Sequence, residues 1–269
     1  MSLFVRESGP SDGPSVVLLH GGGVSGWSWD LQLAALREYH VLVPDLPEHG
    51  ASQDAGPLAI PEAARQVADL IARRAHGGQA HVVGLSLGAQ IGLQLLADEP
   101  ARVCRVILSG TFVLPPGTRS PYQGRVGRTL LAWTVAAYLP LRNVPFLVDL
   151  NRRSLGVPAQ FTPQMAAETR RLTLAGFMRL IDANQGFALP AGLERAQAPA
   201  LILAGEKETA VVRRALPLIR GALPQGEACL VPGVGHNWNL EAPERFNAVM
   251  LAWLAGRPLP EGLTCLPAK

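Results

Sequence analysis

Short, almost continuously apolar runs alternate along this chain with longer stretches of helical periodicity, and this alternation limits the possible fold most strongly. The apolar runs are residues 15–20, 40–45, 80–84, 103–108, 200–204 and 228–232. The helical patterns are residues 60–74, 87–98, 211–222 and 243–254. Parallel strands that helices cover on both faces are apolar throughout. Strands with one face exposed to solvent instead alternate between apolar and polar residues. The sequence therefore predicts an α/β fold built on a doubly wound, mostly parallel sheet.

One long segment interrupts the alternation. Residues 112–194 contain prolines, leucines and aromatic side chains but no strand-like run. We expect them to form a helical cap, or lid, inserted between two strands of a core made of residues 1–111 and 195–269. The segment carries more arginines than acidic residues. We expect these arginines to be solvated, and the alternative is that they attract an anionic substrate.

Composition narrows the class of protein. A chain of 269 residues, 48% hydrophobic and 17% charged, has enough apolar material for one large domain. It contains no apolar run of about 18 residues and no basic start followed by an apolar stretch, so we expect a cytoplasmic protein without a membrane span. The net charge is +3, but the arginines are scattered, so we expect no nucleic-acid partner. A monomer or a homodimer fits equally well.

Three cysteines are present: Cys104, Cys229 and Cys265. Their number and spacing predict neither a disulfide framework nor a Cys-x-x-Cys metal site. Cys104 and Cys229 fall in predicted strands, where we expect small buried fillers. Cys265 falls in a proline-rich tail and is expected to be exposed. No metal ion and no organic cofactor is expected.

The pentapeptide Gly84-Leu85-Ser86-Leu87-Gly88 follows an apolar run and opens a helical pattern. This is the context that the G-x-S-x-G nucleophile motif requires. A sharp strand-to-helix turn strains the backbone of its middle residue. It also leaves no room for side chains on the residues two positions before and after, so glycines are needed at 84 and 88. Such a turn lifts the Ser86 hydroxyl above the edge of the sheet. We therefore interpret Ser86 as the nucleophile.

A second glycine cluster, His20-Gly21-Gly22-Gly23, directly follows the first long apolar run. Its backbone N–H groups can approach a substrate oxygen without interference from side chains. We predict an oxyanion hole formed by the N–H groups of Gly22 and Leu87, with Gly23 beside the substrate. His20 is interpreted as structural. The alternative, a phosphate loop, lacks the usual G-x-G-x-x-G or G-K-[ST] pattern.

A serine nucleophile needs a base and an acid. His236 follows the last long apolar run and therefore lies at the carboxyl edge of the predicted sheet, where chemistry collects in open α/β sheets. Glu208 follows the preceding run, so the chain order of nucleophile, acid and histidine is satisfied. Glu206 is the competing acid, two residues earlier.

These motifs resemble the α/β-hydrolase superfamily. The resemblance includes the HGGG loop, the serine elbow, Gly235-His236 and the segment 45–52, where Glu48 replaces the glycine of the family pattern D-x-P-G-H-G-x-S. We expect that replacement to be a surface change of little consequence. The family most often has aspartate at the acid position, where this chain has Glu208.

The resemblance implies a hydrolase. The haloalkane dehalogenases and epoxide hydrolases of the family have aspartate at the elbow, so Ser86 argues against both activities. The expected activity is that of a carboxylesterase for small to medium esters. The alternatives are a C–C bond hydrolase, lactonase, thioesterase or perhydrolase, or a non-catalytic small-molecule receptor on the same fold. Phe112, Trp133 and Trp238 are the expected pocket-lining side chains, and the alternative for Trp238 is that it anchors the loop of His236.

Overall fold

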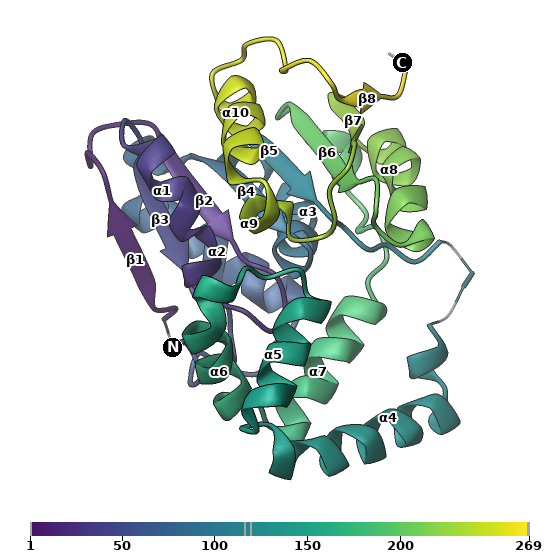
Figure 1. The fold of residues 1–269 in the computed structure, drawn as a ribbon. Helices are drawn as coiled ribbons and strands as arrows, with labels where there is room; N and C mark the ends of the chain where they lie inside the picture. The colour runs from purple at the N-terminus through teal and green to yellow at the C-terminus, as the bar shows by residue number, and fades with distance from the viewer. Residues whose placement is uncertain (1, 116, 119, 268–269) are drawn as a thin grey trace.

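The computed structural model describes residues 2–115, 117, 118 and 120–267, and its centre is an eight-stranded sheet (Figure 1). The strand order is β1-β3-β2-β4-β5-β6-β7-β8. The strands are β1 Val5–Ser8, β2 Ser15–Leu19, β3 His40–Pro44, β4 Ala80–Leu85, β5 Val103–Ser109, β6 Ala200–Gly205, β7 Gly226–Val231 and β8 Thr264–Cys265. Strands β2 to β7 are parallel, and β1 and β8 pair antiparallel at the two edges. The predicted mostly parallel sheet is therefore confirmed.

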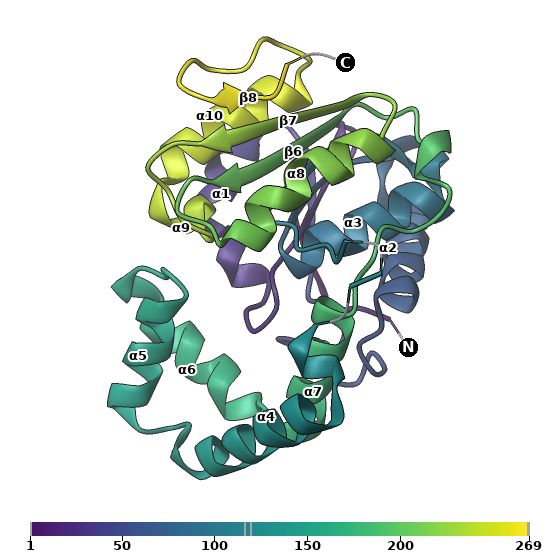
Figure 2. The same cartoon turned by 90° about the vertical axis from the view of Figure 1, so that its right-hand side faces the viewer.

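Helices cover both faces of the sheet, which explains why the central strands are apolar at every position. In β2, Val17 and Leu19 belong to the apolar cluster on one face of the sheet, whereas Val16 and Leu18 belong to the cluster on the other face. Figures 1 and 2 show these two helical layers. The core helices are α1 Asp30–Leu33, α2 Ile60–Arg74, α3 Leu87–Asp98, α8 Ala210–Ala222, α9 Trp238–Glu241 and α10 Pro243–Leu254.

The four remaining helices lie between β5 and β6 in the chain and together at one end of the sheet (Figure 2). They are α4 Arg125–Tyr138, α5 Pro145–Ser154, α6 Thr162–Arg171 and α7 Leu174–Gln185. We call α4–α7 the cap; positions 116 and 119 of the segment expected to form it lie outside the described residues. A small apolar cluster, which includes Phe161 and Met165 of the cap and Val24 and Leu240 of the core, joins the two parts. Among the described helices, none is both long and apolar enough to cross a membrane.

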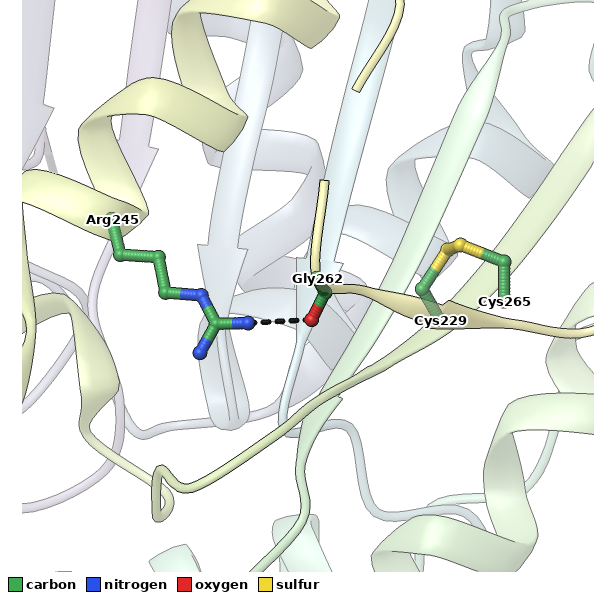
Figure 3. Close-up of a disulfide and its surroundings, with 4 residues drawn as sticks. All are labelled: Cys229, Arg245, Gly262 and Cys265. Atoms are coloured by element: carbon green, nitrogen blue, oxygen red, sulfur yellow. Dashed lines mark hydrogen bonds between the residues drawn. A yellow bond between two sulfur atoms is a disulfide. The ribbon is translucent and has the colours of Figure 1, made fainter. Parts of the chain in front are cut away.

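The cysteine expectations are partly wrong. Cys229 of β7 and Cys265 of β8 form a disulfide across the edge of the sheet, where the two residues are register partners (Figure 3). Arg245 supports the same tail because its guanidinium donates to the carbonyl of Gly262 at 2.7 Å. Cys229 is buried, as expected, but Cys104 is exposed because β5 becomes fully buried only from Val106 onward. Disulfides persist mainly in oxidising compartments, so the cysteines no longer support a cytoplasmic location.

Candidate active site

Ser86 occupies a strained turn between β4 and α3. Its backbone has φ 55° and ψ −112°, a conformation that residues other than glycine rarely adopt. A Cβ at Gly84 would lie 2.5 Å from the carbonyl oxygen of Gly88, and a Cβ at Gly88 would lie 2.1 Å from that of Leu19. Both glycines are therefore required for the turn to close. The Ser86 N–H donates to the carbonyl of Ser109 at 2.8 Å, which fixes the turn to the end of β5.

The glycine loop after β2 lies beside this turn. A Cβ at Gly21 would be 3.6 Å from the Cβ of Ser86. Leu87 is the first residue of α3, so its N–H has no acceptor within the helix. Over Gly22 lies the side chain of Leu180 from the cap helix α7, whose Cδ1 would be 2.8 Å from a Cβ at Gly22. The two proposed oxyanion donors thus belong to adjacent segments, one of them covered by the cap.

His20 holds the glycine loop through both ring nitrogens. Its Nε2 accepts the Leu46 N–H at 2.9 Å, and its Nδ1 donates to the Gly21 carbonyl at 2.8 Å. This pairing requires a neutral imidazole. Complete burial, together with the neighbouring His49, lowers the pKa of His20 to about 3. These contacts agree with the structural role expected for His20.

His236 is hydrogen-bonded to Glu208. The imidazole Nδ1 lies 2.8 Å from Oε1 of the carboxylate. The Glu208 side chain is only 4% exposed, whereas that of His236 is 36% exposed. Glu206 instead accepts the Gly233 N–H at 2.9 Å and does not contact the imidazole. Of the two acids that the sequence left open, Glu208 is therefore the one paired with His236.

Gly110 is a site residue that the sequence analysis missed. It directly follows β5, and a Cβ on it would lie 2.9 Å from Cε1 of His236 and 3.0 Å from Oε1 of Glu208. The residue before Gly110 is Ser109, whose carbonyl accepts the hydrogen bond from the Ser86 N–H. Residues 109 and 110 therefore lie between the serine turn and the His236–Glu208 pair. The available signal was a glycine at the carboxyl end of a central strand.

A cavity of about 690 Å³ lies between the glycine loop and the cap, and Gly22 and Gly23 form part of its wall. Half of its other lining side chains are apolar or aromatic: Leu58, Leu131, Val135, Tyr138, Leu147, Leu150, Leu155, Leu172, Phe177 and Leu180. Three of them, at positions 131, 135 and 138, recur at helical spacing along α4. That periodicity was the signal in the sequence for the pocket side of the helix.

The three aromatic residues expected to line the pocket are absent from this wall. Trp133 lies on the outer side of α4 and is 73% exposed. Trp238 is fully buried, and its indole N–H donates to the Ser109 hydroxyl at 2.9 Å. Phe112 contributes its backbone carbonyl to the amide of Gln90. Trp238 therefore anchors the segment that follows His236 to the end of β5.

Glu48 is not the inconsequential surface residue that we expected. Its side chain is 16% exposed, lines the cavity and forms an ion pair with Arg179 of α7. The hydrogen bond from Arg179 lowers the pKa of the Glu48 carboxyl. A second contact between cap and core joins Glu168 of α6 to the Ser25 hydroxyl at 2.7 Å. Polar side chains therefore bind the cap to the loops that surround the serine.

No metal centre is evident in the part of the chain that the structure describes, because no three of its His, Cys, Asp or Glu side chains are grouped to bind an ion.

Comparison with known proteins identifies the family. The model of the alpha/beta hydrolase family matches residues 16–249, which is most of the chain. The chain belongs to the alpha/beta hydrolase family. This confirms the resemblance inferred from the motifs and establishes the chain as a hydrolase.

Individual relatives of this family member carry several hydrolase names. It is 31% identical to a protein named putative carbamate hydrolase RutD from Escherichia coli, over 95% of this chain and 96% of that one. It is 29% identical to an AB hydrolase superfamily protein from Gibberella zeae, over 99% of this chain and 88% of that one. Among solved structures, an esterase from Thermogutta terrifontis is similar with a TM-score of 0.72 and 23% identity, over 94% of this chain and 93% of that one.

Proposed function

We propose that this hydrolase is a serine carboxylesterase, with Ser86 as nucleophile, His236 as base and Glu208 as acid. The observation that carries the proposal is the 2.8 Å contact between His236 and Glu208, formed on the loops next to a serine held in a strained elbow. A carboxylate at Nδ1 fixes the imidazole tautomer and leaves Nε2 to take a proton.

The reaction follows from these roles. The Ser86 oxygen attacks the carbonyl carbon while His236 removes its proton. The N–H groups of Gly22 and Leu87 stabilise the oxyanion, each donor contributing about 10²–10³ in rate. His236 then protonates the leaving alcohol, and an acyl group remains on Ser86. Water, activated by the same imidazole, releases the acid and restores the enzyme.

The cavity favours small to medium uncharged esters. Leucine, valine, tyrosine and phenylalanine make up half of its lining side chains, and most of the exposed surface of its wall is apolar. Of its charged side chains, Glu48 is paired with Arg179, and Glu168 and Arg171 have opposite signs. Burial keeps the pKa of His49, which also lines the cavity, below its usual value. An apolar acyl or alcohol group therefore gains free energy on transfer from water, about 0.8 kcal/mol per buried CH₂.

Carbamate hydrolysis is the second candidate, and the similarity to the protein named putative carbamate hydrolase favours it. A carbamate carbonyl could be attacked by the same serine and held by the same donors. A carbamate would differ from an ester in carrying a nitrogen on the carbonyl carbon.

The test is hydrolysis of 4-nitrophenyl acetate, butyrate and hexanoate in parallel with a 4-nitrophenyl carbamate. We expect ester turnover that Ser86→Ala reduces by at least about 10³-fold. A fluorophosphonate probe should label Ser86 in the wild type only. Faster turnover of the carbamate would support the second candidate. Ligand-dependent thermal stabilisation with no turnover above that of Ser86→Ala would contradict both and favour a receptor.

A further inference from the structure

Glu48 adopts a backbone conformation that glycine would accept more easily. Its φ is 64°, and Ser86 is the other residue besides glycine with positive φ in the described chain. The loop around it is closed by backbone bonds, since the Glu48 N–H donates to the carbonyl of Ser52 at 3.0 Å. The strain at Ser86 belongs to the nucleophile turn. The strained backbone of Glu48 therefore has a separate explanation, which is the set of contacts that its side chain makes.

The Glu48 carboxylate joins three separate segments of the chain. Its Oε2 accepts the Leu58 N–H at 2.9 Å, from the loop that precedes α2, and the Arg179 Nε–H at 2.9 Å, from the cap. Its Oε1 accepts a second guanidinium bond from Arg179. Paired bonds of this kind between arginine and a carboxylate fix orientation as well as distance. A glycine at this position would leave α7 without this attachment to the core.

Helix α7 matters to the proposed chemistry because it covers the glycine loop. Leu180, the residue after Arg179, contacts Gly22, and Gly176 and Phe177 line the cavity on the same helix. The ion pair therefore fixes the helix next to the proposed oxyanion donor. It also neutralises the Glu48 carboxylate at the cavity wall, so that removing either partner would leave the other without its counter-charge. The other two charged side chains of the wall, Glu168 and Arg171, have opposite signs.

We propose that Glu48 and Arg179 form a latch between core and cap, which positions α7 over the oxyanion loop and makes the cavity select uncharged substrates over anionic ones. Glu48 and Arg179 are positioning and specificity-determining residues. The selectivity, though not the latch, rests on the proposed esterase function.

Selectivity is tested with two esters that differ by one carboxylate, 4-nitrophenyl hexanoate and the mono-4-nitrophenyl ester of adipic acid. Glu48→Gln should raise the kcat/KM ratio of the charged to the neutral ester about tenfold, and Arg179→Gln should lower it about tenfold. The double variant should return close to the wild-type ratio because the wall is again neutral. Both shifts should shrink at high salt. Ratios within about twofold of wild type in both single variants would overturn the selectivity.

The latch is tested without turnover, by amide hydrogen exchange. Glu48→Gly relaxes the backbone while removing the side chain, so loss of fold is not expected. In this variant and in Arg179→Gln, exchange within residues 174–185 should accelerate while that of α10 stays unchanged. Arg65→Gln is the control, since it breaks an exposed ion pair on α2. Unchanged exchange in α7 would overturn the latch. If the wild type hydrolyses neither ester, the esterase function and the selectivity are both overturned. The latch would still be tested by amide hydrogen exchange in α7, which does not depend on turnover.

Discussion

Gly110 and His236 are so close that no side chain fits between them. A Cβ built on Gly110 would lie 2.9 Å from Cε1 of the imidazole and 3.0 Å from Nδ1. The end of β5 thus forms the surface against which the imidazole rests. The position of His236 depends on this glycine as well as on the bond to Glu208.

Gly110→Ala should therefore lose activity by displacing His236. We expect kcat for 4-nitrophenyl butyrate to fall about 10²-fold, since small displacements of catalytic groups have effects of that size. Gly77→Ala is a matched control: its φ of 65° resembles the 63° of Gly110, but nothing lies within 4 Å of the added methyl group. Both variants should lose about 1–2 kcal/mol of stability from backbone strain. Equal activity of the two variants would show that the contact does not position His236.

The neighbouring carboxylates Glu208 and Glu206 provide a second matched pair. Glu208→Ala should lower kcat about 10³- to 10⁴-fold because the imidazole loses the acceptor at Nδ1. Glu206→Ala should keep activity within a few-fold, since the Glu206 carboxylate accepts the Gly233 N–H rather than a bond from the imidazole. Steady-state kinetics on one ester distinguishes the two. A larger loss in Glu206→Ala would contradict the assignment of the acid.

The elements of the core could be predicted from the sequence because their signal is local and strong. The structure has helices at Ile60–Arg74, Leu87–Asp98 and Pro243–Leu254, as the periodicity predicted. The central strands are buried on both faces, so each produces an uninterrupted apolar run that differs from the helical pattern. Motifs tied to the ends of such strands, such as the serine elbow, could then be placed at the correct edge.

Features that depend on contacts between distant segments could not be predicted. The edge strands β1 and β8 span four and two residues and are largely exposed, so they have no apolar signal. The disulfide requires the register of β7 with β8, which spacing along the chain does not reveal. Trp133 was expected in the pocket because it is a large apolar side chain. In the structure it lies on the exposed side of α4, whereas Leu131 and Val135 of the same helix line the cavity. Glu48 is attached to the cap through Arg179, which is 131 residues away along the chain.

The disulfide should contribute to stability but not to catalysis. It joins residues 36 positions apart at the β7–β8 edge, and loops of that length give about 2–4 kcal/mol. Cys265→Ser should lower the free energy of unfolding in urea by that amount while kcat stays unchanged. Thiol titration of the unfolded, unreduced wild type should find one free thiol, that of Cys104. Cys104→Ser is the control and should behave as wild type. A variant Cys265→Ser as stable as wild type would contradict the prediction.

Protonation of His20 should weaken the fold in mild acid. Its pKa is 6.5 when unfolded and about 3 when folded, because the buried imidazole cannot accept a charge. Below pH 6.5 the unfolded chain therefore binds a proton that the folded chain does not, and stability falls by about 1.4 kcal/mol per pH unit until the folded pKa is reached. Burial also lowers the pKa of His81, to about 4, so this histidine adds to the loss in the same direction.

His20→Gln isolates this contribution. The variant should be less stable than wild type at neutral pH because the glycine loop loses its two ring contacts. Between about pH 6 and pH 4 its stability should fall less steeply, by about 1.4 kcal/mol per pH unit, because one titrating group has been removed. Urea unfolding across this range measures both slopes. His76→Gln, which changes an exposed histidine, is the control and should follow the wild-type slope. Parallel slopes for wild type and His20→Gln would show that His20 does not remain neutral in the folded protein.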